Sequence, residues 1–250
     1  MYREAYHRIF PELIAGYDYW GFCDCDLIWG NISGAIEEPM QNGFDKISWR
    51  GHFTLFRNDE TINDVYAKEV DGIYSFRDAI SRTPKNHLNL FDEVGINLLF
   101  DHYGLKTYKG LLFANIKVKY KNFRCSLFSD KEEFKNRNQI FEWYNGTLYR
   151  IYAHNDELHK EEFVYVHFLK RYISNSLSSH SSDHFLIIPN RIIDYEPITL
   201  EKVLKWSKDG FYADYYKRRL NIKRILSKIT SVVKGFFHPV IPDHYDFVIK

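Results

Sequence analysis

Hydrophobic and polar positions along the chain follow two periods, and this change of period predicts a mixed α/β fold. Residues 2–15 carry apolar side chains at helical spacing, which predicts a short helix. The apolar run at residues 17–22 predicts a buried strand, and residues 46–57 predict two strands joined at Arg50-Gly51. Residues 61–70 predict a helix that begins at polar capping residues. We therefore expect helices and strands to alternate in the first part of the chain.

The second part is richer in predicted strands. Residues 111–128 are strand-rich, and Asn145-Gly146 between apolar flanks is typical of a type I′ hairpin turn. The apolar runs at residues 162–168 and 185–189 predict two buried strands, and a helical pattern begins near Thr199. The pattern therefore predicts an α/β domain over residues 1–198 and a helical, basic region over residues 199–250.

Two aspartates directly after the first apolar strand are the strongest chemical signal. Residues i and i+2 of an extended strand point to the same side, so Asp24 and Asp26 are expected to converge while Cys25 faces away. Converging carboxylates repel each other and are costly to bury unless a cation lies between them. Hard oxygen ligands favour Mg²⁺ or Mn²⁺. The alternative, an aspartate pair in a solvated turn, stays open.

Composition narrows the classes of function. A formal net charge of +1 argues against a general nucleic-acid binder, and 45% hydrophobic residues support a packed core. An aromatic content of 18% fits a site that stacks on flat rings or sugars, although a tyrosine-rich core explains it equally well. The first eight residues lack the apolar core of a signal peptide, and the sequence has no run of about 18 uncharged apolar residues, so a cytoplasmic location is expected. The three cysteines are expected to be buried thiols in a reducing compartment: Cys23, Cys25 and Cys125.

The order of three motifs resembles the GT-A glycosyltransferases. These motifs are Asp24-Cys25-Asp26, Phe91-Asp92-Glu93 and Val166-His167-Phe168-Leu169-Lys170, and the resemblance covers roughly residues 5 to 175. More closely, the chain is similar to a bacterial group of uncharacterised GT-A-like proteins found with capsule and surface-polysaccharide genes. The closest stretches are residues 17–30 and 50–58. The resemblance implies a Rossmann-like mixed sheet flanked by helices.

The resemblance also implies a reaction and a metal site. The implied reaction moves a sugar from a nucleotide-sugar donor to a glycan acceptor. By analogy, the match at His167 favours retention of the anomeric configuration over inversion. Asp24 would face the ribose and the metal, Asp26 would bind Mn²⁺ or Mg²⁺ directly, and His167 would complete the site. Lys170 and Arg171 would bind the donor phosphates. For His167, a core histidine with a satisfied ring is the alternative.

Three further residues are expected in the same cleft by resemblance. Asp92 and Glu93 match an acidic motif that contacts the donor sugar or the acceptor, where a carboxylate could take the acceptor's proton. His52 follows a glycine on a predicted strand and would line the site for the substrate. The alternatives are that the acids favour a helix N-terminus and that the histidine is structural.

One departure from the family leaves a second function open. GT-A domains have a longer segment before the Asp-X-Asp motif, whereas only 23 residues precede Asp24 here. The strand at 17–22 is therefore expected to have an exposed edge. A misplaced start codon, a truncated gene or a second chain that supplies the missing part would each explain this. The rival function is a non-catalytic carbohydrate-binding or scaffolding protein; a metal-dependent phosphate-ester hydrolase is weaker, because a second carboxylate cluster is missing from the sequence pattern.

The C-terminal region has its own charge pattern. From Tyr216 to Pro242 there are no acids and seven basic side chains, with apolar residues at helical spacing. Such a helix can lie on an anionic membrane surface, which would suit a lipid-linked glycan acceptor at the inner leaflet. The alternative is a helix that packs its apolar side on the domain and leaves its basic face in solvent.

Overall fold

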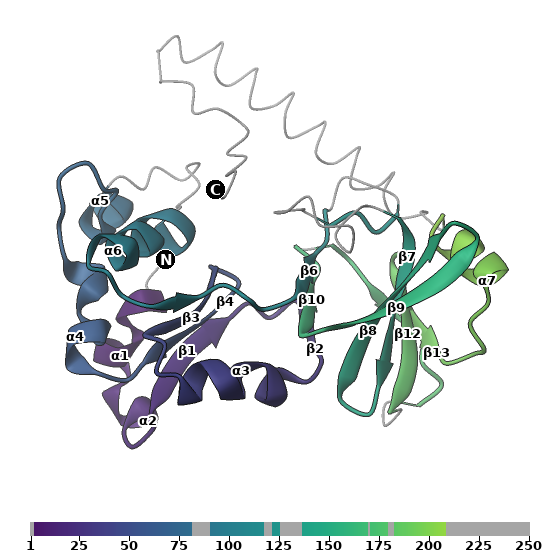
Figure 1. Ribbon diagram of the computed structural model, residues 1–250, viewed down its shortest axis with the longest axis horizontal. Helices are drawn as coiled ribbons and strands as arrows, with labels where there is room; N and C mark the ends of the chain where they lie inside the picture. The colour runs from purple at the N-terminus through teal and green to yellow at the C-terminus, as the bar shows by residue number, and fades with distance from the viewer. Residues whose placement is uncertain are drawn as a thin grey trace, which may run out of the picture. The chain divides into compact units, whose positions relative to one another are not determined.

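The computed structural model describes residues 3–81, 91–117, 122–125, 137–169, 171–179 and 183–208. It is a mixed α/β structure with several sheets, as the pattern of hydrophobic positions predicts (Figure 1). The chain forms two compact units. Unit 1 comprises Met1–Cys25 and Ile32–Leu111, and unit 2 comprises Asp26–Asn31 and Leu112–Lys250.

Unit 1 contains a four-stranded mixed sheet in the order β1-β4-β3-β5. β4 pairs antiparallel with both of its neighbours, and β5 pairs parallel with β3. β1 lies at one edge, as expected for the first apolar strand, and the hairpin at Arg50-Gly51 is confirmed. The strands are β1 (Tyr19–Cys23), β3 (Lys46–Arg50), β4 (Phe53–Arg57) and β5 (Thr107–Tyr108).

The helices of unit 1 are short. The single helix predicted over residues 2–15 is wrong: it is three one-turn pieces, because Pro11 has no N–H to donate and Phe10 leaves the helical conformation. The helix predicted over 61–70 is also interrupted, although Asp59 caps its start by accepting from the N–H groups of Thr61 and Ile62. The helical segments are η1 (Arg3–Ala5), α1 (Tyr6–Ile9), α2 (Pro11–Ile14), α3 (Ile32–Gln41), α4 (Glu60–Asn63), η2 (Val65–Ala67), α5 (Phe76–Ser81), the π-helical η3 (Phe91–Gly95) and α6 (Ile96–His102).

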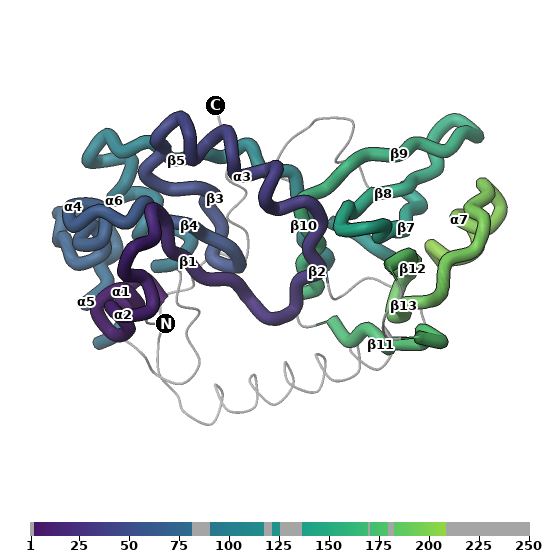
Figure 2. The backbone as a smooth tube through the Cα atoms, turned by 90° about the horizontal axis from the view of Figure 1, so that it is seen from below, coloured from purple at the N-terminus to yellow at the C-terminus, as the bar shows by residue number. Residues whose placement is uncertain are grey.

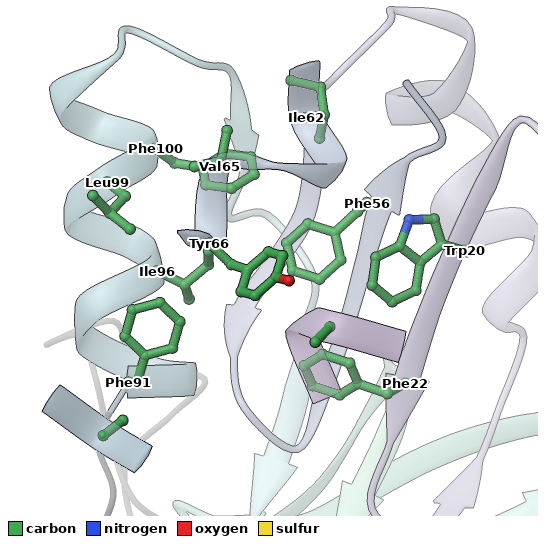
Figure 3. Packing of buried hydrophobic residues seen from close by; sticks show 12 residues of the cluster. Trp20, Phe22, Phe56, Ile62, Val65, Tyr66, Phe91, Ile96, Leu99 and Phe100 are labelled. Atoms are coloured by element: carbon green, nitrogen blue, oxygen red, sulfur yellow. The ribbon is translucent and has the colours of Figure 1, made fainter. Parts of the chain in front are cut away.

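The core of unit 1 lies between its sheet and α6. Figure 3 shows aromatic side chains from β1 and β4 meeting aliphatic and aromatic side chains from η2 and α6. Leu99 and Phe100 of α6 are fully buried. Because η3 runs directly into α6, this packing also fixes the position of Asp92 and Glu93. The residues labelled in the figure are Trp20, Phe22, Phe56, Ile62, Val65, Tyr66, Phe91, Ile96, Leu99 and Phe100.

Unit 2 contains two sheets (Figure 2). In the smaller one, β10 (Tyr165–His167) lies between β2 (Leu27–Trp29), which is antiparallel to it, and β6 (Phe113–Asn115), which is parallel. The larger one has six strands in the order β11-β13-β12-β7-β8-β9. Its strands are β7 (Asn138–Tyr144), β8 (Thr147–His154), β9 (Glu157–Phe163), β11 (Ser174–Asn175), β12 (His184–Ile188) and β13 (Arg191–Asp194).

The turn chemistry of unit 2 follows the sequence closely. Asn145 and Gly146 have φ of 44° and 82°, which confirms a turn with two left-handed residues between β7 and β8.

The strand predicted over residues 162–168 is two strands, since the chain stops pairing with β8 at Val164. There the backbone of Val164 bonds to Leu112 and to Gly30. The strand predicted at 185–189 is confirmed as β12.

One helix of unit 2 is described, α7 (Leu200–Trp206), which begins near Thr199 as expected, and the Thr199 side chain caps it. Val203 packs it on the six-stranded sheet. The rest of the predicted C-terminal helix lies outside the described residues, so the division at 198/199 stays a prediction. Among the described residues, no helix has the length and apolar character needed to cross a membrane.

The cysteine prediction is wrong for two of three thiols. Cys125 is buried, whereas Cys23 and Cys25 are exposed. Side chains alternate along β1, so Cys23 falls on its outward side, and Cys25 lies beyond the end of that strand.

Candidate functional site

Asp26 and His167 meet in unit 2 at the end of the small sheet. Asp26 directly precedes β2, and His167 is the last residue of β10, opposite Leu27 in the antiparallel ladder. The N–H of Phe168 donates to the carbonyl of Asp26 at 3.0 Å. The Asp26 Oδ1 and His167 Nε2 atoms are 3.3 Å apart. Backbone pairing therefore brings together two of the predicted metal ligands.

The other ring nitrogen of His167 has a partner of its own. Nδ1 lies 3.0 Å from Oδ1 of Asn115, which is its neighbour in the parallel register between β6 and β10. His167 is 4% exposed, so this contact is shielded from water. An amide oxygen only accepts hydrogen bonds, so this assignment puts the proton on Nδ1. In the neutral ring, the Nε2 lone pair then faces Asp26.

This arrangement fits a divalent cation. A carboxylate oxygen and an imidazole lone pair repel each other at 3.3 Å unless a proton or a metal ion lies between them. Neighbouring ligands on a small ion with bonds of about 2.1 Å are also about 3 Å apart. Oxygen and imidazole ligands suit Mn²⁺ and, less well, Mg²⁺. Asn115 would orient the histidine, as hydrogen-bond partners of metal-bound imidazoles commonly do.

Asp24 belongs to unit 1 and has different partners. Its N–H donates to the carbonyl of His52 at 2.8 Å, and its Oδ1 accepts from Arg3 Nη2 at 2.5 Å. The expectation of one extended strand through the aspartate pair is wrong, because β1 ends at Cys23 and both aspartates lie in the connection to β2. Asp24 and Asp26 are still only two residues apart, so their Cα atoms are within about 7 Å of each other.

Two further predicted residues pack beside Gly51 in unit 1. A Cβ atom on Gly51 would lie 2.9 Å from Asp92 Cγ and 3.1 Å from Glu93 Cγ, so the glycine makes room for both side chains. Arg3 Nη1 donates to the Gly51 carbonyl at 2.7 Å, and Arg50 Nη1 lies 3.6 Å from Glu93 Oε2. These contacts form an acidic cluster with two arginines at its border.

Burial changes the acidity of this cluster. It raises the pKa of Asp92, against the opposing charge of Arg3, and raises the pKa of Glu93, against that of Arg50. Both carboxylates are therefore better proton acceptors than exposed ones.

The acidic cluster has neighbours that no sequence motif marks, Glu4 and Arg3. Glu4 is 3% exposed, and burial raises its pKa to about 7. Its Oε1 atom has no hydrogen-bond partner among the described residues. Neither Glu4 nor Arg3 belongs to a motif, and only the structure brings them near the predicted acids. His52, which was predicted, is also buried, and its carbonyl holds Asp24.

The predicted phosphate-binding pair receives less support. Arg171 is 6% exposed, and its guanidinium donates to Asn190 Oδ1 at 3.0 Å and to the Asn122 carbonyl at 3.4 Å. Burial lowers the pKa of Arg171 to about 10. This guanidinium is thus already held by protein groups. Lys170 lies outside the described residues, and both roles stay predictions.

Comparison with known proteins identifies a family without assigning an activity. Searches of curated proteins and of solved structures gave no match. One family profile matches residues 1–196, which is most of the chain and includes every candidate residue above. The chain therefore belongs to the family of unknown function DUF6625.

Proposed function

We propose that this protein is a metal-dependent, GT-A-like glycosyltransferase of bacterial capsule or surface-polysaccharide synthesis. It transfers a sugar from a nucleotide-sugar donor to a glycan acceptor. The observation that carries the proposal is the Asp26–His167 pair, with Asn115 on the far ring nitrogen. This is a donor set that suits Mn²⁺ or Mg²⁺, at the positions where the resemblance to GT-A enzymes puts the metal ligands.

Asp26 and His167 of unit 2 would hold the ion, and a role for Asp24 stays a prediction. Asn115 keeps the imidazole in the tautomer that presents Nε2. When bound, the ion offsets the negative charge on the departing nucleoside diphosphate. Within unit 1, Arg3 is an ion-pair partner of the Asp24 carboxylate.

Asp92 or Glu93 accepts the proton of the attacking hydroxyl. Their raised pKa values support this role, because a buried carboxylate that resists ionisation takes a proton more readily. Gly51 allows both side chains to approach the β3–β4 turn, where His52 supports the backbone of Asp24. A lipid-linked acceptor at an anionic membrane surface would fit the basic C-terminal sequence.

The test is a calorimetric titration of UDP and of GDP into the full chain, with and without Mn²⁺. The proposal predicts that one nucleotide binds in the presence of Mn²⁺ and that Asp26→Asn abolishes this binding. Asp156→Asn is the matched control, because Asp156 is an exposed turn residue of unit 2 with φ of 59°, which asparagine tolerates. Metal-independent binding, or no binding by a folded wild-type chain, would contradict the proposal and favour the non-catalytic alternative.

A further inference from the structure

One face of the six-stranded sheet in unit 2 is divided into a covered and an uncovered part. Residues that pair across neighbouring strands point to the same face of a sheet. The aliphatic residues of this face pack against Val203 of α7, and they are Ile140, Ile151, Leu186 and Ile188. The adjoining row across the sheet is polar and aromatic, from Tyr195 beside β13 through His184 to Tyr144 at the end of β7. Tyr195 and Tyr144 are 42% and 47% exposed.

A groove opens where this row meets α7. Its volume is about 450 Å³, and Ile188 and Ile193 are its aliphatic lining residues. Tyr195 and Trp206 are its aromatic lining residues. The remaining lining residues are polar or charged: Ser176, Arg191, Asp194 and Glu196.

The aromatic surface is held rigidly although it is exposed. The rings of His184 and Tyr195 stack with centroids 3.6 Å apart and an interplanar angle of 20°. The His184 Nε2 atom is 2.8 Å from Oε1 of Glu142, a 5% exposed carboxylate that also accepts from Lys160 Nζ at 2.6 Å. A buried ion-paired group thus fixes the ring on which Tyr195 lies. An aromatic side chain fixed before binding loses little entropy when a ligand arrives.

The charges around the groove cancel. The two acids are Asp194, which accepts from the N–H of Ser178, and Glu196, whose Oε2 accepts from Lys202 Nζ at 2.6 Å. Lys202 also lies over the ring of Trp206, 5.5 Å from its centroid, and Arg191 is the second base. A neutral ligand that both donates and accepts hydrogen bonds matches this surface better than a phosphate or an amine does.

We propose that this groove binds a neutral glycan. The C–H faces of a sugar ring would lie on Tyr195 and Trp206, and its hydroxyls would bond to Asp194, Glu196 and Arg191. Tyr144 would extend the same surface to further sugars along the chain of the glycan. The role of this site as a second hold on the acceptor rests on the proposed glycosyltransferase function, whereas its binding chemistry uses residues of unit 2 alone.

The test is calorimetry of the full chain with three neutral hexasaccharides, cellohexaose, maltohexaose and chitohexaose, in a buffer that contains EDTA. At least one should bind saturably without metal. Tyr195→Ala should weaken that binding at least tenfold, and Tyr172→Ala, which changes an exposed tyrosine outside the groove lining, should not. Glu196→Gln removes one acceptor while preserving shape, and it should weaken binding several-fold even if Tyr195→Ala fails to fold.

Either of two results with the hexasaccharides would overturn the inference. One is the absence of binding by a wild-type chain that unfolds cooperatively. The other is unchanged sugar affinity in both Tyr195→Ala and Glu196→Gln. Asp26→Asn separates this site from the proposed metal site, because it should leave EDTA-resistant sugar binding intact. UDP binding that Tyr195→Ala abolishes would assign the groove to a nucleotide and would also contradict the inference.

Discussion

At the residue scale, the chemistry of this chain depends on the hydrogen-bond partners and the burial of each functional side chain. Asp26 and His167 are both singled out by the sequence, through their motifs. The residue that gives His167 its tautomer is Asn115, which is 52 positions away and reaches it only through strand pairing. A single sequence contains no signal for such a partner. The same holds for Glu4, whose burial follows from tertiary packing.

Glu4 predicts a pH dependence of stability. Its pKa is raised from 4.5 to about 7 in the folded chain, mainly by burial, so the folded state binds more protons than the unfolded state between these values. Stability therefore falls as pH rises from about 4.5 to 7. Glu4→Gln should stabilise the chain at pH 8 by about 3 kcal/mol and change it little at pH 4.

Urea unfolding at the two pH values measures this effect. Glu12→Gln is the matched control, since Glu12 is an exposed glutamate in α2 and its substitution should not alter the pH profile. Equal effects of Glu4→Gln at pH 4 and pH 8 would contradict the assignment.

At the element scale, the sequence predicts best where local chemistry decides the structure. The Asn145-Gly146 turn, the start of a helix near Thr199 and the strands on either side of Gly51 are found as expected. Predictions fail where a continuous apolar run spans the end of one element and the start of the next. This happens at Phe10, where the helix is interrupted before a proline, and at Val164, which separates β9 from β10. Periodicity does not separate one long strand from two strands in different sheets.

Gly146 supplies a test at this scale. Its φ of 82° is costly for a residue with a Cβ atom, and a Cβ there would meet no neighbour within 4 Å, so the cost is conformational rather than steric. Gly146→Ala should destabilise the chain by about 1 kcal/mol, and Gly146→Asn by less, because asparagine tolerates the left-handed region. Thermal unfolding that ranks alanine at or above asparagine would disprove this reading of the turn.

At the scale of the whole molecule, the fold class could be predicted and the division into units could not. The mixed α/β character follows from the hydrophobic periods, whereas each compact unit is built from segments that interleave along the chain. The boundary falls between Cys25 and Asp26, inside the motif that first suggested a metal site. No change in composition marks it, because both sides belong to one polar connection. Long-range pairing of β2 with β10 assigns Asp26 to unit 2.

We propose that Asp26 and His167 bind a divalent cation, and a titration of the full chain with Mn²⁺ followed by electron paramagnetic resonance tests this binding without any assumption about the reaction. We expect one Mn²⁺ site that is lost in Asp26→Asn and in His167→Gln, weakened about 10- to 100-fold in Asn115→Leu, and unchanged in Asp156→Asn. Mn²⁺ binding of equal strength in Asp26→Asn and in the wild-type chain, or no site in the folded wild-type chain, would contradict the proposal.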